Sequence, residues 1–447
     1  MRFKLLFAAF GAAFLLTGCV IKPIEEGSTA IQTEPGTAAP DETTAAEEAV
    51  TTTGETTITT SDTTEETTGA TTAKRPDPPA DLVLKGLENV EAGADLTVAD
   101  FITERNVGLK DGDAWLDTTK TGECTAEVTY LYGGAEFTQK LHYRVADTTA
   151  PHIFDPGRGA VHRLGKAFDL NAYIGYGDNF DPKPVMSYTG EVDPETEGSY
   201  PLTVTVTDQA GNAVSWDVTI RVAAEVPKPA DTIRRVNYSD FISRYKGDGV
   251  TFGIDVSAWQ GDVDYKAVRE AGCSFVIMRV GHYYSKVKLD DYFQKNLKNA
   301  AAAGLQVGVY FYTTDRNEKD VREHVRWITE QLGGQKLDLP IVFDWEEFSD
   351  FEEYGISIRE LNDVYAAFAD EVRKQGYQPM LYGSKNVLNE VWSARSKQLA
   401  PVWLAHYVRE TTYTGAYEIW QQSAYGRIPG VSGDVDMDIR YLKKEAD

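Results

Sequence analysis

The stretch Leu339-Pro-Ile-Val-Phe-Asp344-Trp-Glu346 places two carboxylic acids directly after an apolar run. A near-continuous apolar run of this kind is typical of a parallel strand that is covered on both faces, so we predict a strand over residues 340–346. Because side chains alternate along a strand, Asp344 and Glu346 are expected to point to the same face. Burial and mutual repulsion should raise the pKa of one acid and leave the other ionised.

The same pattern of short apolar runs continues through the sequence from Thr251 onward. Eight strands are predicted, at residues 253–257, 275–280, 306–312, 340–346, 378–383, 401–407, 418–423 and 435–440. The intervals 292–303, 320–332 and 358–375 have the apolar spacing of amphipathic helices. Strands that alternate with helices imply a parallel sheet, and eight of them in under 200 residues predict a compact, irregular (β/α) barrel.

Four acids are expected to meet at one end of this barrel. Asp255 closes the first apolar run, Asp436 falls in the last, and Asp344 and Glu346 belong to the fourth. Active sites of such barrels occupy the C-terminal ends of the strands, and the first and eighth strands are neighbours in a closed barrel. The sequence therefore predicts one cluster of carboxylates.

The motifs around these acids also point to a known family. They are Gly253-Ile-Asp255-Val-Ser-Ala-Trp259-Gln-Gly261, Phe-Asp344-Trp-Glu346, Trp403-Leu-Ala-His-Tyr407, Ile-Trp420-Gln421 and Val-Asp436-Met. In this order they resemble the glycoside hydrolase family 25 lysozymes, over about residues 251–442. The resemblance implies peptidoglycan as substrate, cut between N-acetylmuramic acid and N-acetylglucosamine. It implies Glu346 as general acid and Asp344, Asp255 and Asp436 as supporting carboxylates. One departure is Asp438, where the family commonly has Asn.

Aromatic residues near the strand ends are expected to form a platform for the sugars. The substrate-binding set is Trp259, Tyr310, Tyr312, Tyr382, Trp403, Tyr407 and Trp420, together with Arg279. Arg279 ends the second strand and is expected to pair with an acid of the site. His282 and His406 have no Cys or His partner at metal-ligand spacing, so neither a metal nor a cofactor is predicted.

Two readings besides a muramidase stay open at this point. The barrel can be a non-catalytic module that binds cell-wall glycan, although a binding groove has no use for a costly acid pair. It can also be a glycosidase of chitin-like polymers. The residues do not decide whether a carboxylate or the substrate's own N-acetyl group attacks the sugar.

The N-terminus predicts export and lipidation. Arg2 and Lys4 precede an apolar run that is too short for an ordinary membrane span, so residues 1–18 are a predicted signal peptide. The run ends in Leu16-Thr-Gly-Cys19, which resembles a bacterial lipobox and implies that Cys19 carries the lipid. The alternative is an ordinary cleaved signal with an incidental cysteine. The predicted location is extracytoplasmic, anchored to the bacterial cell membrane.

Residues 19–79 are rich in Thr and Glu and have almost no aromatic residues, which predicts a disordered tether. About 60 residues of flexible chain have an r.m.s. span of roughly 40–45 Å. A second, shorter linker is predicted over residues 227–250, before the catalytic barrel at 251–447.

Residues 80–148 and 149–226 contain an internal repeat. The segments Leu116–Gly122 and Val192–Gly198 lie 76 positions apart (193 − 117 = 76), and each is followed by alternating apolar residues and a Gly-containing turn. This pattern predicts two all-β modules that resemble bacterial immunoglobulin-like domains, the first one divergent. Their expected role is that of a spacer, with wall or carbohydrate binding as the alternative. Asp178, Asn179 and Asp181 suggest calcium, but turn chemistry explains them more simply.

Composition excludes other classes of function. The formal net charge of −25 argues against nucleic acid, whose phosphates require a basic surface. Only 3 cysteines occur, so there is no disulfide framework. Cys124 and Cys273 are interpreted as small buried hydrophobic residues.

Overall fold

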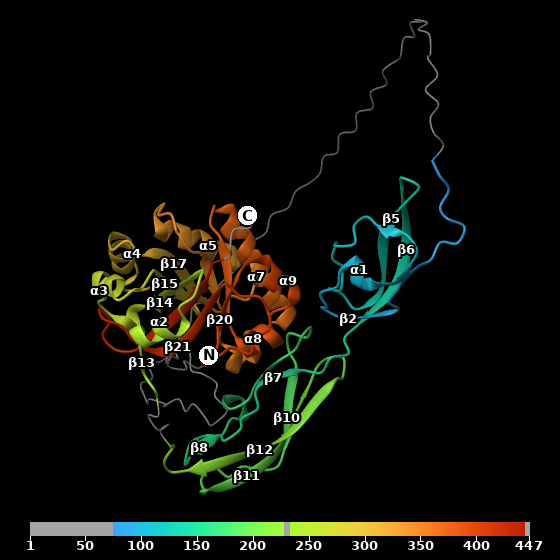
Figure 1. Cartoon of the computed structure of the whole chain (residues 1–447). Helices are drawn as coiled ribbons and strands as arrows, with labels where there is room; N and C mark the ends of the chain where they lie inside the picture. Colours follow the sequence, from blue (N-terminus) through green and yellow to red (C-terminus); the bar gives the residue numbers. More distant parts are fainter. Residues whose placement is uncertain (1–74, 228–232, 443–447) are drawn as a thin grey trace, which may run out of the picture.

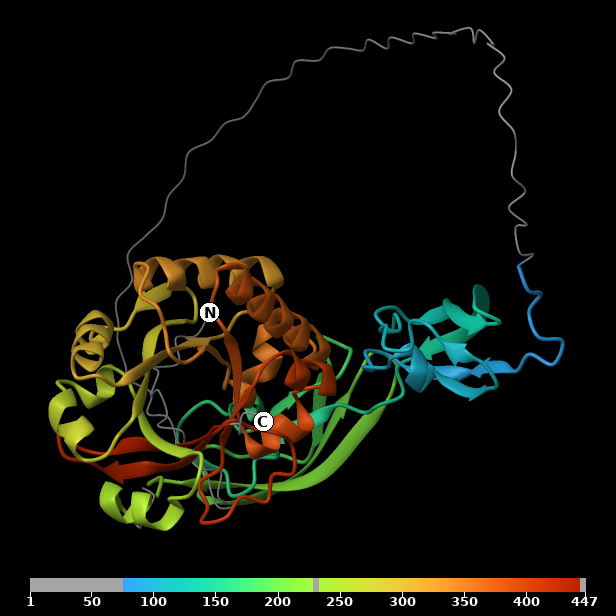
Figure 2. The same ribbon diagram turned by 45° about the horizontal axis from the view of Figure 1, so that its top comes forward.

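The computed structural model describes residues 75–227 and 233–442. The predicted signal peptide, Cys19 and nearly all of the predicted tether lie outside these residues. Figures 1 and 2 show three parts: a barrel ringed by helices, a β module lying against it, and another β module projecting to the side. We call strands β1 to β6 with helix α1 the first β module, and strands β7 to β12 the second.

Eight strands form a closed barrel in the C-terminal part of the chain. They are β14 (Val250–Val256), β15 (Phe275–Tyr283), β17 (Gln306–Thr313), β18 (Ile341–Asp344), β19 (Pro379–Ser384), β20 (Val402–Ala405), β21 (Ile419–Arg427) and β22 (Val435–Tyr441). Each pairs with the next, and β22 pairs with both β21 and β14, which closes the ring. The predicted β/α barrel is therefore confirmed, and all eight predicted strands form.

The last strand corrects the expectation of an all-parallel sheet. β22 runs antiparallel to both of its neighbours, whereas the other pairings in the ring are parallel. The cause is the short connection from Ile428 to Asp434, because parallel neighbours need a crossover of about a dozen residues or more. Gly430 lets this connection turn: its φ is 96°, and a Cβ there would lie 2.4 Å from the Asp264 carbonyl oxygen.

Helices cover the outside of the barrel (Figure 2). They are α3 (Tyr265–Glu270), α4 (Phe293–Ala302), α5 (Glu318–Leu332), α6 (Phe351–Tyr354), α7 (Ile358–Lys374), α8 (Lys385–Glu390) and α9 (Ala394–Leu399). The three helices predicted from the sequence correspond to α4, α5 and α7. Two small strands lie beside the ring: β13 (Val236–Asn237) pairs with β21, and β16 (Val287–Leu289) pairs with β15.

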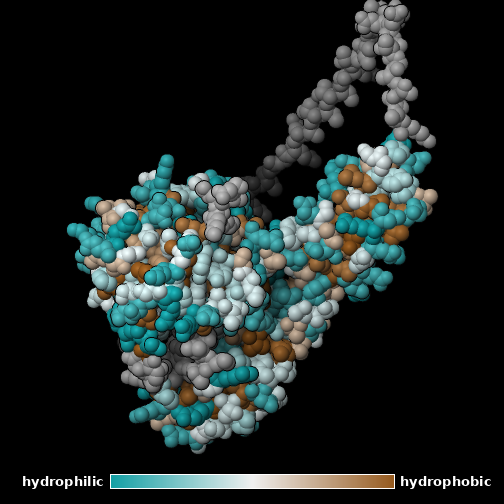
Figure 3. Space-filling view, viewed as in Figure 1, coloured by the Kyte–Doolittle hydropathy of each residue, from teal (hydrophilic) through white to brown (hydrophobic). Residues whose placement is uncertain are grey.

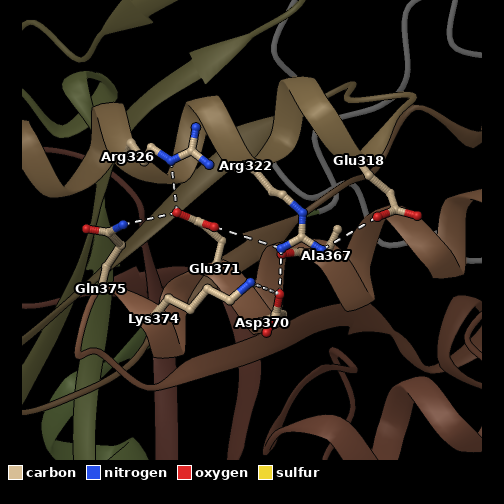
Figure 4. A network of polar contacts seen from close by, with 8 residues as sticks. All are labelled: Glu318, Arg322, Arg326, Ala367, Asp370, Glu371, Lys374 and Gln375. Carbon is tan, nitrogen blue, oxygen red and sulfur yellow. Dashed lines mark hydrogen bonds and ion pairs between the residues drawn. The ribbon is translucent and has the colours of Figure 1, made fainter. Parts of the chain in front are cut away.

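Ion pairs join the two longest helices, α5 and α7 (Figure 4). Arg322 on α5 lies 2.6 Å from Asp370 and Arg326 lies 2.9 Å from Glu371, both on α7. Lys374 also reaches Asp370 at 2.7 Å. Glu371 is only 5% exposed, so its charge needs these partners more than a surface carboxylate does.

The barrel has two apolar layers. One lies between strands and helices and includes Phe343, Trp345 and Met437; the other fills the barrel interior and includes Val342, Met380 and Trp403. Alternate residues of each strand therefore contribute to opposite layers. Because apolar side chains fill the middle of the barrel, polar side chains that point inward lie beyond this layer, toward one end. A polar site is therefore expected at that end of the barrel.

The two β modules repeat one arrangement. In the first, the hairpin β5 (Gly122–Tyr132) and β6 (Ala135–Ala146) is flanked by β4 (Gly108–Leu109) and by β2 (Asn89–Glu91), which runs parallel to β6. In the second, the hairpin β11 (Gly198–Thr207) and β12 (Ala213–Ala223) is flanked by β10 (Val185–Thr189) and by β8 (Val161–Arg163), parallel to β12.

Each module also has a small separate sheet of two antiparallel strands. The first module pairs β1 (Leu84–Gly86) with β3 (Ile102–Arg105), next to helix α1 (Val98–Phe101). The second pairs β7 (His152–Asp155) with β9 (Gly175–Gly177). Val128, Tyr130, Val204 and Val206 are buried, as the alternation predicts. Cys273 is buried as predicted, but Cys124 on β5 is only half-buried, because that part of the strand lies at the edge of the core.

Contacts tie both modules to the barrel. In the second module, the ring of Phe154 packs in a tilted arrangement against Phe348 and edge-on against Phe351, with ring centroids 5.2 Å apart in each pair. In the first, the Asp95 carboxylate accepts the backbone N–H of Arg395 at 3.1 Å. Figure 3 shows hydrophobic residues gathered over the first module, whereas the barrel face in that view is largely hydrophilic. Helix α2 (Tyr238–Tyr245) precedes β14 and packs on it through Phe241 and Phe252.

Within the described residues, no helix is both long and apolar enough to span a bilayer.

Candidate active site

The acid pair lies where β18 ends. The ladder ends at Asp344, two residues earlier than the predicted strand, yet the alternation continues beyond it. Phe343 and Trp345 enter the layer under the helices, while Asp344 and Glu346 line one cavity at the barrel end. The Trp345 indole N–H donates to the Asp315 carbonyl oxygen at 3.3 Å. This bond and the burial of Trp345 hold Glu346 on the cavity side.

Asp344 and Glu346 interact directly, since each carboxyl group affects the pKa of the other, and Asp344 Oδ1 is buried without a hydrogen-bond partner. Burial, together with the charge of Glu346, raises the pKa of Asp344 well above its usual range. Enclosure by the cavity raises the pKa of Glu346 to about 7, although water still reaches its side chain. The pKa values of both acids are raised, and because the two groups are coupled, their titration belongs to the pair.

Three more acids come from the neighbouring strands β14 and β22. Asp436 lies directly opposite Asp255 in the ladder, because the antiparallel direction of β22 brings its beginning to this end of the barrel. Asp438 points the same way and is fully buried beneath the cavity, where it hydrogen-bonds Asp255. Burial raises the pKa of Asp255 to about 7, and it raises those of Asp436 and Asp438 well above their usual range.

Gln421 on β21 connects the carboxylates to the aromatic wall. Its Nε2 donates to Asp255 Oδ2 at 2.8 Å. Its Oε1 accepts the hydroxyl groups of Tyr382 at 2.9 Å and Tyr407 at 2.8 Å. One buried amide therefore fixes an acid and two tyrosines from three other parts of the barrel.

The cavity at this end is lined by residues from every side of the barrel. Its lining consists of Asp255, Val256, Ser257, Trp259, Gln260, Arg279, Tyr284, Tyr310, Tyr312, Asp344, Glu346, Tyr382, Trp403, Tyr407, Gln421 and Asp436. The structure thus brings together the four acids, Arg279 and six of the seven aromatic residues that were singled out from the sequence. Trp259 is 58% exposed, so it stands at the rim.

Trp420 is the exception, and its assignment to substrate binding was wrong. It precedes Gln421 on β21, so with Gln421 inside the barrel the indole must face outward. Its N–H donates to the His406 carbonyl oxygen at 2.8 Å, and its ring lies 5.6 Å from that of Tyr245 on α2. Trp420 is a core residue.

Arg279 pairs with Asp290, which is not one of the predicted site acids. The guanidinium Nη2 and Nε lie 2.7 and 2.8 Å from Asp290 Oδ2, and Asp290 is only 3% exposed. The same oxygen accepts the backbone N–H of Ala258 at 3.0 Å, which fixes the turn that carries Trp259. Asp290 lies in a loop without a distinguishing pattern, so no sequence signal identified it.

Other residues of the cavity were also missed. Gln421 and Gln260 belong to motifs that were quoted, but no role followed from their type alone. Alternation could have placed Gln421 inside once β21 was recognised, since it lies two residues after Ile419, which belongs to the interior layer. Tyr284 follows β15 by one residue, and its ring lies 5.5 Å from that of Tyr312.

The barrel is similar in sequence to known glycosyl hydrolases. Residues 254–431 match the model of the glycosyl hydrolases family 25. The chain is 31% identical over 198 residues to Lysozyme M1 of Streptomyces globisporus, covering 41% of this chain and 65% of that protein. It is 29% identical over 189 residues to the autolytic lysozyme of Clostridium acetobutylicum, covering 42% and 54%. The chain therefore spans less than two thirds of the length of these two relatives.

Among solved structures, a bacterial lysozyme from Streptomyces coelicolor has 27% sequence identity and a TM-score of 0.38, covering 44% of this chain and 93% of that one. The resemblance of the barrel to family 25 that the motifs indicated is confirmed by the family model over the residues it matches.

Proposed function

We propose that this protein is a muramidase that hydrolyses the β-1,4 bond between N-acetylmuramic acid and N-acetylglucosamine in peptidoglycan. The observation that carries the proposal is that Asp344 and Glu346, two acids with raised pKa values, line one aromatic-walled cavity together. Burying several acids together is costly, and a purely glycan-binding cavity does not need a raised pKa. The match of the barrel to the family 25 model and to two lysozymes supports the same reaction.

Glu346 is the proposed general acid. It is the water-accessible member of the pair, so it is the one that can reach a glycosidic oxygen in the cavity. When Glu346 gives its proton to the leaving oxygen, the pair gains one negative charge, which stabilises the positive charge that develops on the sugar ring.

The separation of the two acids bears on the nucleophile. Inverting glycosidases hold their two carboxyl groups roughly 6.5–9.5 Å apart, and retaining enzymes with a carboxylate nucleophile about 5–5.5 Å apart. The N-acetyl group of the substrate can replace the second carboxylate as nucleophile, and we propose that it does so here, with Asp344 orienting it. Asp344 lies beside Glu346 at the same strand end, which suits a positioning role. Asp255 and Asp436 support the site from the neighbouring strands, and Gln421 positions Asp255.

The remaining segments would place the enzyme at the cell surface. Cys19 would carry the lipid anchor and residues 19–79 would act as tether, outside the described part of the chain. The two β modules, which we propose to be immunoglobulin-like, would act as spacers that hold the barrel within reach of the wall.

Product analysis tests this function. Purified peptidoglycan and chitin are each digested with the full-length protein, the products are reduced with borohydride, and the reduced ends are identified by mass spectrometry. We expect muramitol at the new ends of peptidoglycan fragments and little release from chitin. New ends that are only glucosaminitol, or preferential release of chitin oligosaccharides, would overturn the proposal. Binding to walls without any release would identify a glycan-binding module instead.

A further inference from the structure

A second group of acids lies far along the chain from the barrel site, at the joint between the two β modules. Asp147 follows β6 in the connection between the modules, Asp178 follows β9, and Asp208 follows β11. One carboxylate oxygen of each lies within 4.8 Å of the others. Asp178 is fully buried and Asp208 is 6% exposed, so water screens their repulsion poorly.

Two oxygens of this group have no hydrogen-bond partner. Asp178 Oδ1 accepts the backbone N–H groups of Phe180 and Asp181 at 2.8 and 2.7 Å, but Asp178 Oδ2 is buried without a donor. Asp147 Oδ1 is likewise buried and unpaired. A buried carboxylate oxygen without a donor costs free energy, and here two such oxygens from different modules belong to one cluster.

The charges around the cluster are also negative. Burial, and then the carboxylates of Asp178, Asp208 and Glu91, raise the pKa of Asp147 to about 7. Glu91 itself is occupied, since it accepts the backbone N–H groups of Thr148 and Thr149 and the side-chain amide of Asn179. The backbone that follows Asp147 is therefore held in place while its carboxylate faces other acids.

We propose that Asp147, Asp178 and Asp208 bind a calcium ion at the joint between the two β modules. Only oxygen donors are offered, which suits a hard divalent cation and not zinc or copper. The cluster differs from the Asp178, Asn179 and Asp181 group that the sequence suggested. The Asp181 carboxylate is already used by the backbone N–H of Lys183 and by the backbone and side chain of Gln209.

A cation at this position would fix three parts of the molecule at once. Asp147 belongs to the connection between the modules. The carbonyl oxygens of Asp178 and Asn179 accept the backbone N–H groups of Ile358 and Arg359 at 2.8 and 3.1 Å, at the start of barrel helix α7. Asn212 joins the third acid to the same joint: its backbone N–H and side-chain amide donate to Asp208 Oδ1 and Oδ2 at 2.8 Å each, and the amide also donates to the Asp147 carbonyl oxygen. Each Asp208 oxygen keeps a second lone pair for a cation, and the unpaired oxygens that distinguish this cluster from Asp181 belong to Asp147 and Asp178.

Calorimetric titration tests the site. The full-length chain is stripped of divalent ions with EDTA, exchanged into chelator-free buffer and titrated with calcium chloride. We expect one saturable site with Kd of about 10⁻⁴–10⁻³ M, the range of extracellular modules. At about 10 to 100 times Kd, the melting temperature of the β modules should rise by roughly 5–15 °C.

Three variants decide whether these residues are responsible. Asp178→Asn keeps an oxygen for the amides of Phe180 and Asp181, and Asp147→Asn is equally conservative. Each should weaken calcium binding at least about tenfold, since a charged ligand is lost. Asp193→Asn removes an exposed acid beside the other end of β11 and should leave the titration unchanged.

Stability without calcium separates a ligand site from a structural acid cluster. The Asp178→Asn and Asp147→Asn variants lose repulsion, so in EDTA they should melt at the same temperature as the wild type or higher. The proposal is overturned if calcium produces neither heat nor a melting shift, or if Asp178→Asn binds calcium as tightly as the wild type. It is also overturned if both variants are destabilised in EDTA, which would show that a shared proton holds the acids together.

Discussion

The indole N–H of Trp403 donates a hydrogen bond to Asp438 Oδ1 at 2.9 Å, at the base of the cavity. Asp438 also hydrogen-bonds Asp255, and burial raises its pKa well above the usual range. A protonated Asp438 explains both contacts, because it accepts from Trp403 with one oxygen and donates to Asp255 with the other. In this state an aspartic acid has the hydrogen-bonding pattern of an asparagine, the residue common at this position in the family that the barrel resembles.

The first prediction concerns this residue. Asp438→Asn should keep the rate of wall hydrolysis within about twofold of the wild type, which corresponds to a change of ~0.4 kcal/mol in the barrier. Its amide group can accept from Trp403 and donate to Asp255. Asp438→Leu is the contrasting variant, because it leaves both partners unpaired at a cost of about 1–3 kcal/mol each. A tenfold loss in the Asn variant would contradict a neutral Asp438.

Stability against pH gives Asp438 a second test. A buried acid with a raised pKa stabilises the fold at low pH, and this stabilisation is lost as pH rises through the folded-state pKa. Asp438→Asn removes one such group. The difference in free energy of unfolding between the variant and the wild type should therefore grow in favour of the variant from pH 5 to pH 9, as measured by urea denaturation.

Replacement of the proposed general acid should abolish activity. Glu346→Gln keeps the size of the side chain but cannot donate the proton, and proton donation contributes about 10²–10⁴-fold to the rate. The assay is release of reducing ends from purified peptidoglycan. Glu410→Gln, an exposed glutamate of the same barrel, is the matched control and should retain full rate. Wild-type activity in a folded Glu346→Gln protein would refute the assignment.

The pH dependence should show a mildly acidic optimum. The raised pKa of Glu346, about 7, sets the upper limit of the basic limb, since water that reaches the side chain reduces the effect of burial. Above that pH the proton is lost and the rate should fall by about tenfold per pH unit. Initial rates on soluble peptidoglycan from pH 4 to 9, at constant ionic strength, measure the profile.

Asp344→Asn tests the coupling of the pair. An amide at this position is uncharged and can donate to Glu346, as a protonated Asp344 does. The basic limb should therefore stay near its wild-type position, and a shift to lower pH would show that Asp344 is ionised in the wild type. A basic limb that moves to higher pH would show that Asp344 and Glu346 do not interact as described.

Gln421 should be needed for activity although it carries no charge. Gln421→Met leaves Asp255, Tyr382 and Tyr407 without their shared partner, and the rate should fall by about 10- to 100-fold, or roughly 1.4–2.7 kcal/mol. Gln422→Met is the control: its side chain donates to the Val408 carbonyl oxygen, outside the cavity lining. Equal losses in the two variants would mean that the effect is one of strand stability.

Lipidation is tested by Cys19→Ser, which should release the protein from membranes and leave hydrolysis by the barrel unchanged. Cys124→Ser removes a half-buried cysteine of the first β module and should stay membrane-bound. Fractionation of cells followed by a high-salt wash measures both. A Cys19→Ser protein that still sediments with membranes after the wash would reveal another anchor.

Much of the barrel could be predicted because its signal is local. Apolar runs such as Ile341 to Phe343 identify buried strands, and period-two alternation places Asp344 and Glu346 on one side. The direction of β22 could not be predicted in the same way. An antiparallel strand whose outer face is buried has the same pattern of apolar residues as a parallel strand. The connection before β22 is short only because β21 extends to Arg427, four residues past the predicted strand, and the predicted bounds did not show this.

Residues that act through other residues were the ones that sequence reasoning missed. Gln421 and Asp290 have roles only because three-dimensional contacts bring Asp255 and Arg279 to them. Trp420 shows the opposite error: its type suggested a sugar platform, whereas its position one residue from Gln421 turns it outward. The protonation of each acid also depends on how deeply its carboxyl group is buried in the barrel. The alternation of residues along a strand does not show this depth.

The order of the barrel strands has a consequence for biosynthesis. Asp255 on β14 pairs with Asp436 on β22, and 181 positions separate them (436 − 255 = 181). During synthesis, seven of the eight barrel strands emerge before the one that supplies Asp436 and Asp438. An unfinished chain therefore has neither a closed ring nor a complete set of carboxylates. Under the proposed function, the barrel becomes competent for wall hydrolysis only when its last strand is in place.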